Sequence, residues 1–97
     1  RDELAKALAP VLDAIQRDHA AAATQAAAMQ QIEALTDELA KGKEADDSRI
    51  AGILDELARM VPGAVAAVAS AFANPLLSGL AGPVTEFLLG QWRRGGA

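Results

Sequence analysis

The chain has 97 residues, a formal net charge of −4 at pH 7, one histidine and no cysteine. The missing cysteines exclude disulfides, thiol catalysis and cysteine-ligated zinc. The negative charge argues against nucleic acid as a primary partner, because phosphate binding requires a basic surface. About half of the residues are hydrophobic, but almost half of those are alanine, which buries little surface. A chain of this size buries only roughly 60–65% of its unfolded surface, so we expect self-association to supply further burial.

We expect residues 1–97 to form a single helical module. The first residue is Arg1, which leads us to expect that the module belongs to a longer protein. The polar N-terminal residues do not resemble a secretory signal, because no apolar run lies near them. We therefore expect a cytoplasmic location, with membrane association as the alternative.

Residues 1–41 predict a long amphipathic N-terminal helix with a kink at Pro10. Proline inside a helix removes one backbone hydrogen bond and crowds the preceding turn. No further glycine or proline occurs before Gly42, and the uninterrupted part from residue 10 would be about 48 Å long. Apolar or small residues recur in steps of three and four, which is typical of one helix face. That face comprises Val11, Leu12, Ile15, His19, Ala22, Ala26, Met29, Ile32, Leu35 and Leu39.

The sequence leads to specific predictions for three residues of this face. We expect His19 to pack on the apolar face or at its border, because a lone histidine is more often a packed residue than a catalytic one. Ala22 and Ala26 have almost no side-chain bulk, so we expect them to be points of close helix contact.

Residues 42–48 predict a turn between two helices. Gly42 follows Lys41 where a glycine commonly ends a helix. The apolar stripe then disappears, and Asp46, Asp47 and Ser48 are candidate N-caps. The alternative is one uninterrupted helix to residue 60, at a cost of about 1 kcal/mol for glycine relative to alanine. We favour the hairpin, followed by a second amphipathic helix over 49–61.

Residues 61–85 carry no charge and are numerous enough to cross a bilayer. Three prolines divide the stretch, and each fits the first turn of a helix. Halves of about a dozen residues span only about 18 Å, which is too short for a membrane. We therefore expect an apolar segment over 62–92 with short helices starting at Pro62, Pro75 and Pro83, and a basic, flexible tail over 93–97.

The predicted fold class is all-α, because the β-branched residues never alternate with polar ones over a useful length. We expect an oligomeric helical bundle. Its core or interface is predicted to consist of Leu35, Leu39, Ile50, Ile53, Leu54, Leu57, Val65, Val68, Phe72, Leu76, Leu80, Phe87, Leu88 and Trp92.

Residues able to support catalysis are scarce. His19 is the only histidine and therefore the only candidate for a histidine general base. No serine lies in a nucleophile motif. Glu33 and Asp37 share a helix face, but a di-iron bundle also needs a Glu-x-x-His motif, which the sequence lacks. We therefore expect no enzyme activity, cofactor, metal ion or small-molecule substrate.

These observations predict a helical interaction module that binds a second copy of itself or another helical protein. One alternative is a membrane-active or membrane-anchored protein, pore-forming or holin-like, that uses residues 61–92. Trp92 followed by Arg93 and Arg94 is similar to an anchor at a membrane interface. A second alternative is a structural rod in a larger assembly, which requires a continuous helix through Gly42.

Overall fold

The structure is a computed structural model that describes residues 2–95. Within this range the chain forms α-helices and two short 3₁₀ turns, with no β-strand, so the predicted all-α class is confirmed. The described helices are α1 (Asp2–Arg17), α2 (Ala22–Leu39), α3 (Asp47–Met60), α4 (Val65–Ala71), α5 (Pro75–Ser78) and α6 (Pro83–Gly95).

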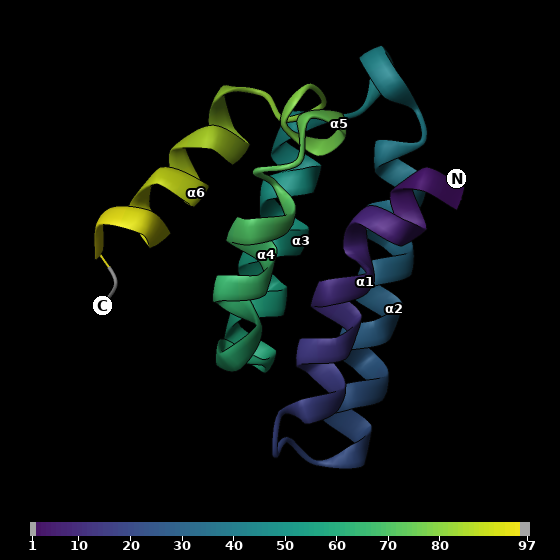
Figure 1. The fold of residues 1–97 in the computed structure, drawn as a ribbon, viewed down its shortest axis with the longest axis vertical. Helices are drawn as coiled ribbons and strands as arrows, with labels where there is room; N and C mark the ends of the chain where they lie inside the picture. Colours follow the sequence, from purple (N-terminus) through teal and green to yellow (C-terminus); the bar gives the residue numbers. More distant parts are fainter. Residues whose placement is uncertain (1, 96–97) are drawn as a thin grey trace.

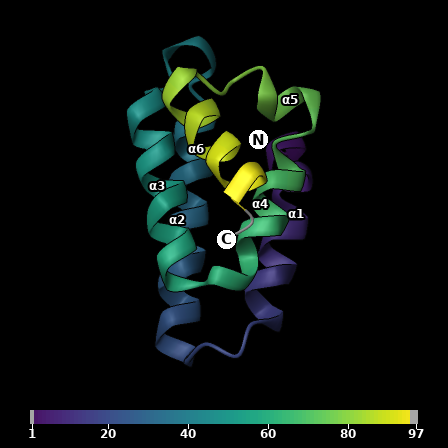
Figure 2. The same cartoon turned by 90° about the vertical axis from the view of Figure 1, so that its left-hand side faces the viewer.

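The helices form three layers across a body of 35 × 30 × 19 Å (Figure 1). α1 and α2 form one layer, α3 and α4 the middle layer, and α6 the third. The view from the side of α6 shows this helix lying across the middle layer (Figure 2). α2 packs on α3, α1 packs on α4, and α6 packs mainly on α3.

The single long helix predicted over 1–41 is wrong, because the chain folds back after Arg17. The carboxylate of Asp18 accepts a hydrogen bond from the backbone N–H of Ala20 at 2.9 Å. The side-chain amide of Gln25 donates to two carbonyls at the end of α1, at 2.9 and 3.2 Å. These side chains satisfy backbone groups that a continuing helix would have paired, so the turn needs neither glycine nor proline.

The early turn changes which residues are buried. His19, Ala22 and Ala26 are all exposed, so the predictions of a packed histidine and two close-contact alanines are wrong. Ala28 is fully buried in their place. α1 itself continues through Pro10 without restarting, and Figure 1 shows its first turns inclined to the remainder.

The hairpin at Gly42 is confirmed, and the continuous helix to residue 60 is excluded. α2 ends at Leu39 and a short 3₁₀ turn, Gly42–Glu44, leads towards α3. Gly42 has a φ of +62°, a conformation that glycine adopts at little cost. Asp46 caps α3, because its carboxylate accepts a hydrogen bond from the backbone N–H of Arg49 at 3.2 Å.

The three predicted proline starts are also confirmed. Pro62 opens the 3₁₀ turn Pro62–Ala64 before α4, and Pro75 and Pro83 are the first residues of α5 and α6. The predicted tail begins inside α6, because this helix extends to Gly95. Residues 96–97 of that tail lie outside the described part of the chain.

Candidate functional site

Most of the predicted core residues are buried in the bundle. The partly buried members are Val65, Leu80, Leu88 and Trp92. Leu76 and Phe87 are exposed, by 38% and 63%, so neither belongs to the core of this chain. The buried members are Leu35, Leu39, Ile50, Ile53, Leu54, Leu57, Val68 and Phe72.

In the short C-terminal helices, the leucine that is buried is the one that follows the predicted leucine. Leu77 and Leu89 are fully buried, whereas the adjacent Leu76 is exposed and Leu88 is only partly buried. α5 has only four residues, which is about one turn, so its apolar residues cannot define a face by repetition. In α1, Leu4 and Leu8 also join the core, although neither was among the predicted core residues.

Two exposed hydrophobic residues lie on the side of α6 that faces away from the bundle. Phe87 is 63% exposed and Val84 is 47% exposed, which makes them the most exposed large hydrophobic residues in the described chain. Gln91 and Arg94 are also exposed and follow at helical spacing on the same side. We call these four residues the outer face of α6. The opposite side of the helix is anchored by the buried Leu89.

The carboxylate of Asp47 fixes the position of α6. It accepts hydrogen bonds from the backbone N–H groups of Gly82 at 3.0 Å, Val84 at 2.6 Å and Thr85 at 3.1 Å. The hydroxyl of Thr85 donates in return to the backbone carbonyl of Asp47 at 3.3 Å. Asp47 is the first residue of α3, so one side chain caps a helix that starts 36 residues later.

The hydrogen bonds also set the ionisation of Asp47. Desolvation by burial would raise the pKa of this carboxyl, but hydrogen bonds from Thr85, Val84 and Gly82 outweigh it and leave the pKa below its ordinary value. A Cβ atom on Gly82 would meet the Asp47 carboxylate at 2.5 Å, so the close approach of loop and carboxylate requires glycine there. The cap is therefore a fixed anion at neutral pH.

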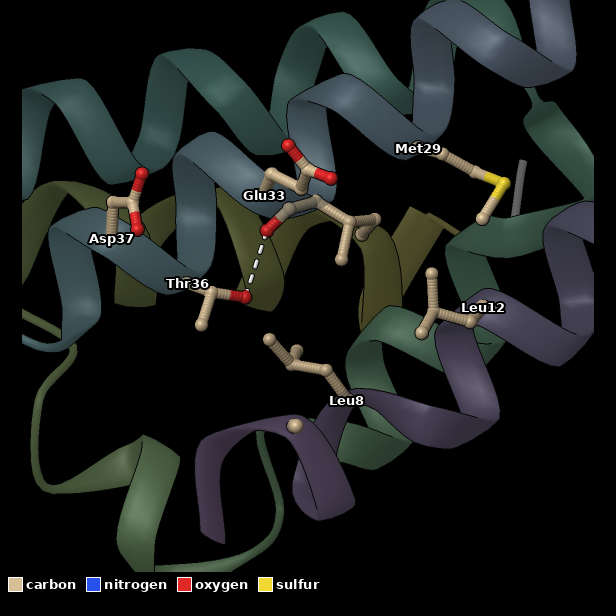
Figure 3. Close-up of a pocket in the computed structure, with 8 residues that line it drawn as sticks. Leu8, Leu12, Met29, Glu33, Thr36 and Asp37 are labelled. Atoms are coloured by element: carbon tan, nitrogen blue, oxygen red, sulfur yellow. Dashed lines mark hydrogen bonds between the residues drawn. The ribbon is translucent and has the colours of Figure 1, made fainter. Parts of the chain in front are cut away.

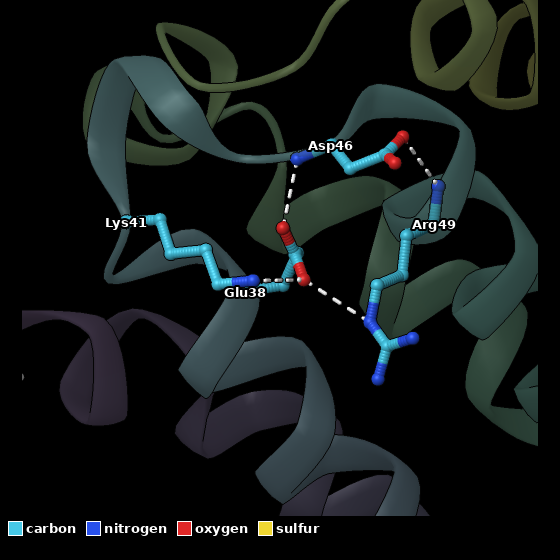
Figure 4. Close-up of polar contacts among 4 residues, drawn as sticks. All are labelled: Glu38, Lys41, Asp46 and Arg49. Atoms are coloured by element: carbon cyan, nitrogen blue, oxygen red, sulfur yellow. Dashed lines mark hydrogen bonds and ion pairs between the residues drawn. The ribbon is translucent and has the colours of Figure 1, made fainter.

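A second carboxylate holds the hairpin between α2 and α3 (Figure 4). Glu38 is only 2% exposed and accepts a hydrogen bond from the backbone N–H of Asp46 at 2.8 Å. Lys41 and Arg49 each approach the same carboxylate at 3.1 Å. The backbone hydrogen bond from Asp46, helped by the two cations, keeps the pKa of Glu38 below its ordinary value despite desolvation. These partners satisfy the buried Glu38 carboxylate, which therefore holds the two sides of the hairpin together.

A groove of about 380 Å³ runs between α1 and α2 (Figure 3). Leu8 and Ile32 form its buried floor, and Leu12 and the 40% exposed Met29 border it. Ala5 and Thr36 also line the groove, and the Thr36 hydroxyl donates to the carbonyl of Ile32 at 2.8 Å. Figure 3 shows two carboxylates along the α2 side. They belong to Glu33 and Asp37.

A wider cleft of about 650 Å³ lies between α4 and α6. Val65, Ala66 and Ala69 of α4 line one side of it, and Trp92 and Arg93 of α6 line the other. The cleft is therefore apolar with a single cation at its border.

Neither a metal centre nor a membrane span is found in residues 2–95. No group of three or more histidine, aspartate and glutamate side chains is placed to hold a metal ion there. None of the helices in that range combines the length and hydropathy needed to cross a bilayer. Comparison of the chain with protein families, curated proteins and solved structures found no match.

Proposed function

We propose that this chain is a non-enzymatic helical interaction module that binds a second copy of itself through the outer face of α6. The supporting observation is the exposure of Phe87 and Val84 on a helix whose other side is anchored in the bundle. Large aromatic side chains in the centre of an exposed patch are the usual anchors of protein interfaces. The burial shortfall of a small, alanine-rich chain gives the same surface a physical reason to associate.

The exposed surface of Phe87 sets the scale of this association. A phenylalanine side chain buries about 200 Å² when it is enclosed. With 63% of Phe87 exposed, about 125 Å² remains to be covered by a partner. At about 25 cal/mol per Å² the transfer of this area out of water supplies at most roughly 3 kcal/mol, from which the costs of association are subtracted. One helix face is smaller than a standard interface, so we expect weak, reversible binding.

Sedimentation velocity over a concentration series from about 10 to about 500 µM tests the proposal. The unmodified chain should show a mass that rises with concentration, and Phe87→Ser should remain near the 10.0 kDa monomer. Leu76→Ser is the matched control, because Leu76 is also an exposed hydrophobic residue but lies on α5. The proposal is wrong if the unmodified chain stays monomeric, or if both variants weaken association equally.

A second candidate function is attachment to an anionic membrane surface. The cleft between α4 and α6 supports it, because Trp92 and Arg93 border an apolar wall of Val65, Ala66 and Ala69. Flotation with phosphatidylserine vesicles measures this directly. Flotation that Arg93→Glu abolishes would favour the membrane, whereas a protein that stays at the bottom of the gradient would remove this candidate. The alternative of a structural rod required a continuous helix through Gly42, and no helix continues through that residue.

A further inference from the structure

We infer that the outer face of α6 in one copy binds the groove between α1 and α2 of the next copy, so that the chains join head to tail. The inference rests on the proposed function and specifies the surface that receives α6. It follows from three matching properties of the two surfaces: shape, spacing and charge.

The groove offers the concave apolar surface that an exposed helix face requires. Helix pairs present a furrow between their side-chain ridges, and amphipathic helices bind such furrows through residues about one turn apart. Leu8 and Ile32 form the floor here, with Leu12 and Met29 at the border. Met29 is 40% exposed, and its flexible, polarisable thioether adapts well to an aromatic ring. Phe87 is the side chain on α6 that fits this position.

The distance from the apolar anchor to the nearest charged group is similar on the two surfaces. The guanidinium of Arg94 folds back against Gly90, 3.3 Å from where a Cβ atom on that glycine would lie. Gly90 is three residues from Phe87, which is about 4.5 Å along the helix axis. In α2, Glu33 and Asp37 lie about 6 and 12 Å from Met29 along the axis. With Phe87 against Met29 and the two helices parallel, the Arg94 guanidinium therefore falls opposite the Glu33 carboxylate.

The charges favour the groove over a second α6 as the partner. The outer face of α6 carries Arg94 and no carboxylate, because Glu86 lies on a different side of the helix. Within residues 2–95 no ion pair involves Arg93 or Arg94. The charged side chains that line the groove are both acidic. Contact between two outer faces of α6 would bring no opposite charges together. Contact between an outer face and the groove brings Arg94 to acidic side chains.

The two surfaces lie on opposite sides of the molecule. Figures 1 and 2 show α3 and α4 between α6 and the α1–α2 layer, so a chain cannot fill its own groove. An interface between two different surfaces leaves one of each free at the ends. The structure therefore predicts chains longer than dimers, or closed rings, as concentration rises.

Mixing two complementary variants tests the arrangement. Phe87→Ser removes the anchor from α6 but keeps the groove, and Met29→Lys places a cation in the groove but keeps the face. Each variant alone should associate at least about tenfold more weakly than the unmodified chain. Their mixture contains one intact face and one intact groove, so it should form one-to-one dimers of twice the 10.0 kDa monomer mass and nothing larger.

The possible results separate the two proposals. If the unmodified chain associates but the mixture does not, α6 binds elsewhere and the head-to-tail arrangement is wrong, while the proposed self-association stands. If the unmodified chain is monomeric at about 500 µM, both are wrong. Circular dichroism of each variant checks that the helices are retained.

Charge exchange provides an independent readout. Glu33→Arg and Arg94→Glu should each weaken association by about three- to tenfold, and the two substitutions in one chain should restore most of the loss. A double variant that associates more weakly than either single variant would overturn the pairing of α6 with this groove. Arg93→Glu is the control, because Arg93 lines the cleft beside α4 and does not lie on the outer face of α6.

Discussion

Removing the Asp47 carboxylate should destabilise the protein and release the start of α6. Asp47→Ala leaves the backbone N–H groups of Gly82, Val84 and Thr85 without their acceptor. Loss of an N-cap costs about 0.5–2 kcal/mol, and hydrogen bonds to a charged group contribute about 1.5–3 kcal/mol when buried. The site is partly open to water, so we expect a loss of about 2–3 kcal/mol in the free energy of unfolding.

That loss is large for a protein of this size. A domain of 97 residues is stable by about 5–15 kcal/mol, and each kcal/mol corresponds to about 4–8 °C in Tm. Asp47→Ala should therefore lower Tm by roughly 10–20 °C. Asp47→Asn keeps one acceptor oxygen and should lose about half as much free energy.

Chemical denaturation followed by circular dichroism gives the free energy, and hydrogen exchange shows where protection is lost. The exchange of the amides of Val84 and Thr85 should accelerate most. Asp55→Asn is the matched control, because the Asp55 carboxylate pairs with Arg59 on the surface at 2.8 Å and should contribute under about 0.5 kcal/mol. An Asp47→Ala variant as stable as this control would refute the assigned role of Asp47.

Three further predictions concern stability. Gly42→Ala should destabilise the folded protein by about 1 kcal/mol, because φ is +62° at this position. Gly52→Ala, in the exposed middle of α3, should stabilise the folded protein by about 0.5–1 kcal/mol. Urea unfolding of both variants measures the sign of each change. Glu38→Gln should lower Tm, while Glu44→Gln in the exposed turn should not, and equal Tm values would contradict the role of Glu38. Because the pKa values of Glu38 and Asp47 are lowered in the folded state, their stabilisation is complete above the ordinary values of 4.5 and 3.8 and is lost as pH falls further. Tm should thus be level down to about pH 5 and then decline, and a decline that begins near neutrality would contradict this.

The sequence predicted the elements that depend on local chemistry. Gly42 marked the hairpin, and the prolines at 62, 75 and 83 marked helix starts, because each residue restricts its own backbone. The turn after Arg17 was missed because its signal is polar and non-local: Gln25 reaches back across the turn to the end of α1. A cluster of Asp18 and His19 before alanines was the only local sign of a break.

The candidate site was harder to predict, because it depends on which side of a short helix meets the bundle. Phe87 was predicted as core or interface, and it is exposed on α6, whose first turn is held by Asp47. No local pattern links residues 47 and 84. Leu89 is buried whereas Phe87, half a turn away on the same helix, is exposed.

A dilution series followed by backbone amide NMR tests the exposed face most directly. Between about 1 mM and about 20 µM, the amides of Phe87, Gln91 and Arg94 should shift along one binding curve. The amides of Met29 and Glu33 should follow the same curve, while those of α3 stay unchanged. Resonances of α6 that do not move over this range would contradict the central claim that the outer face of α6 is a binding surface.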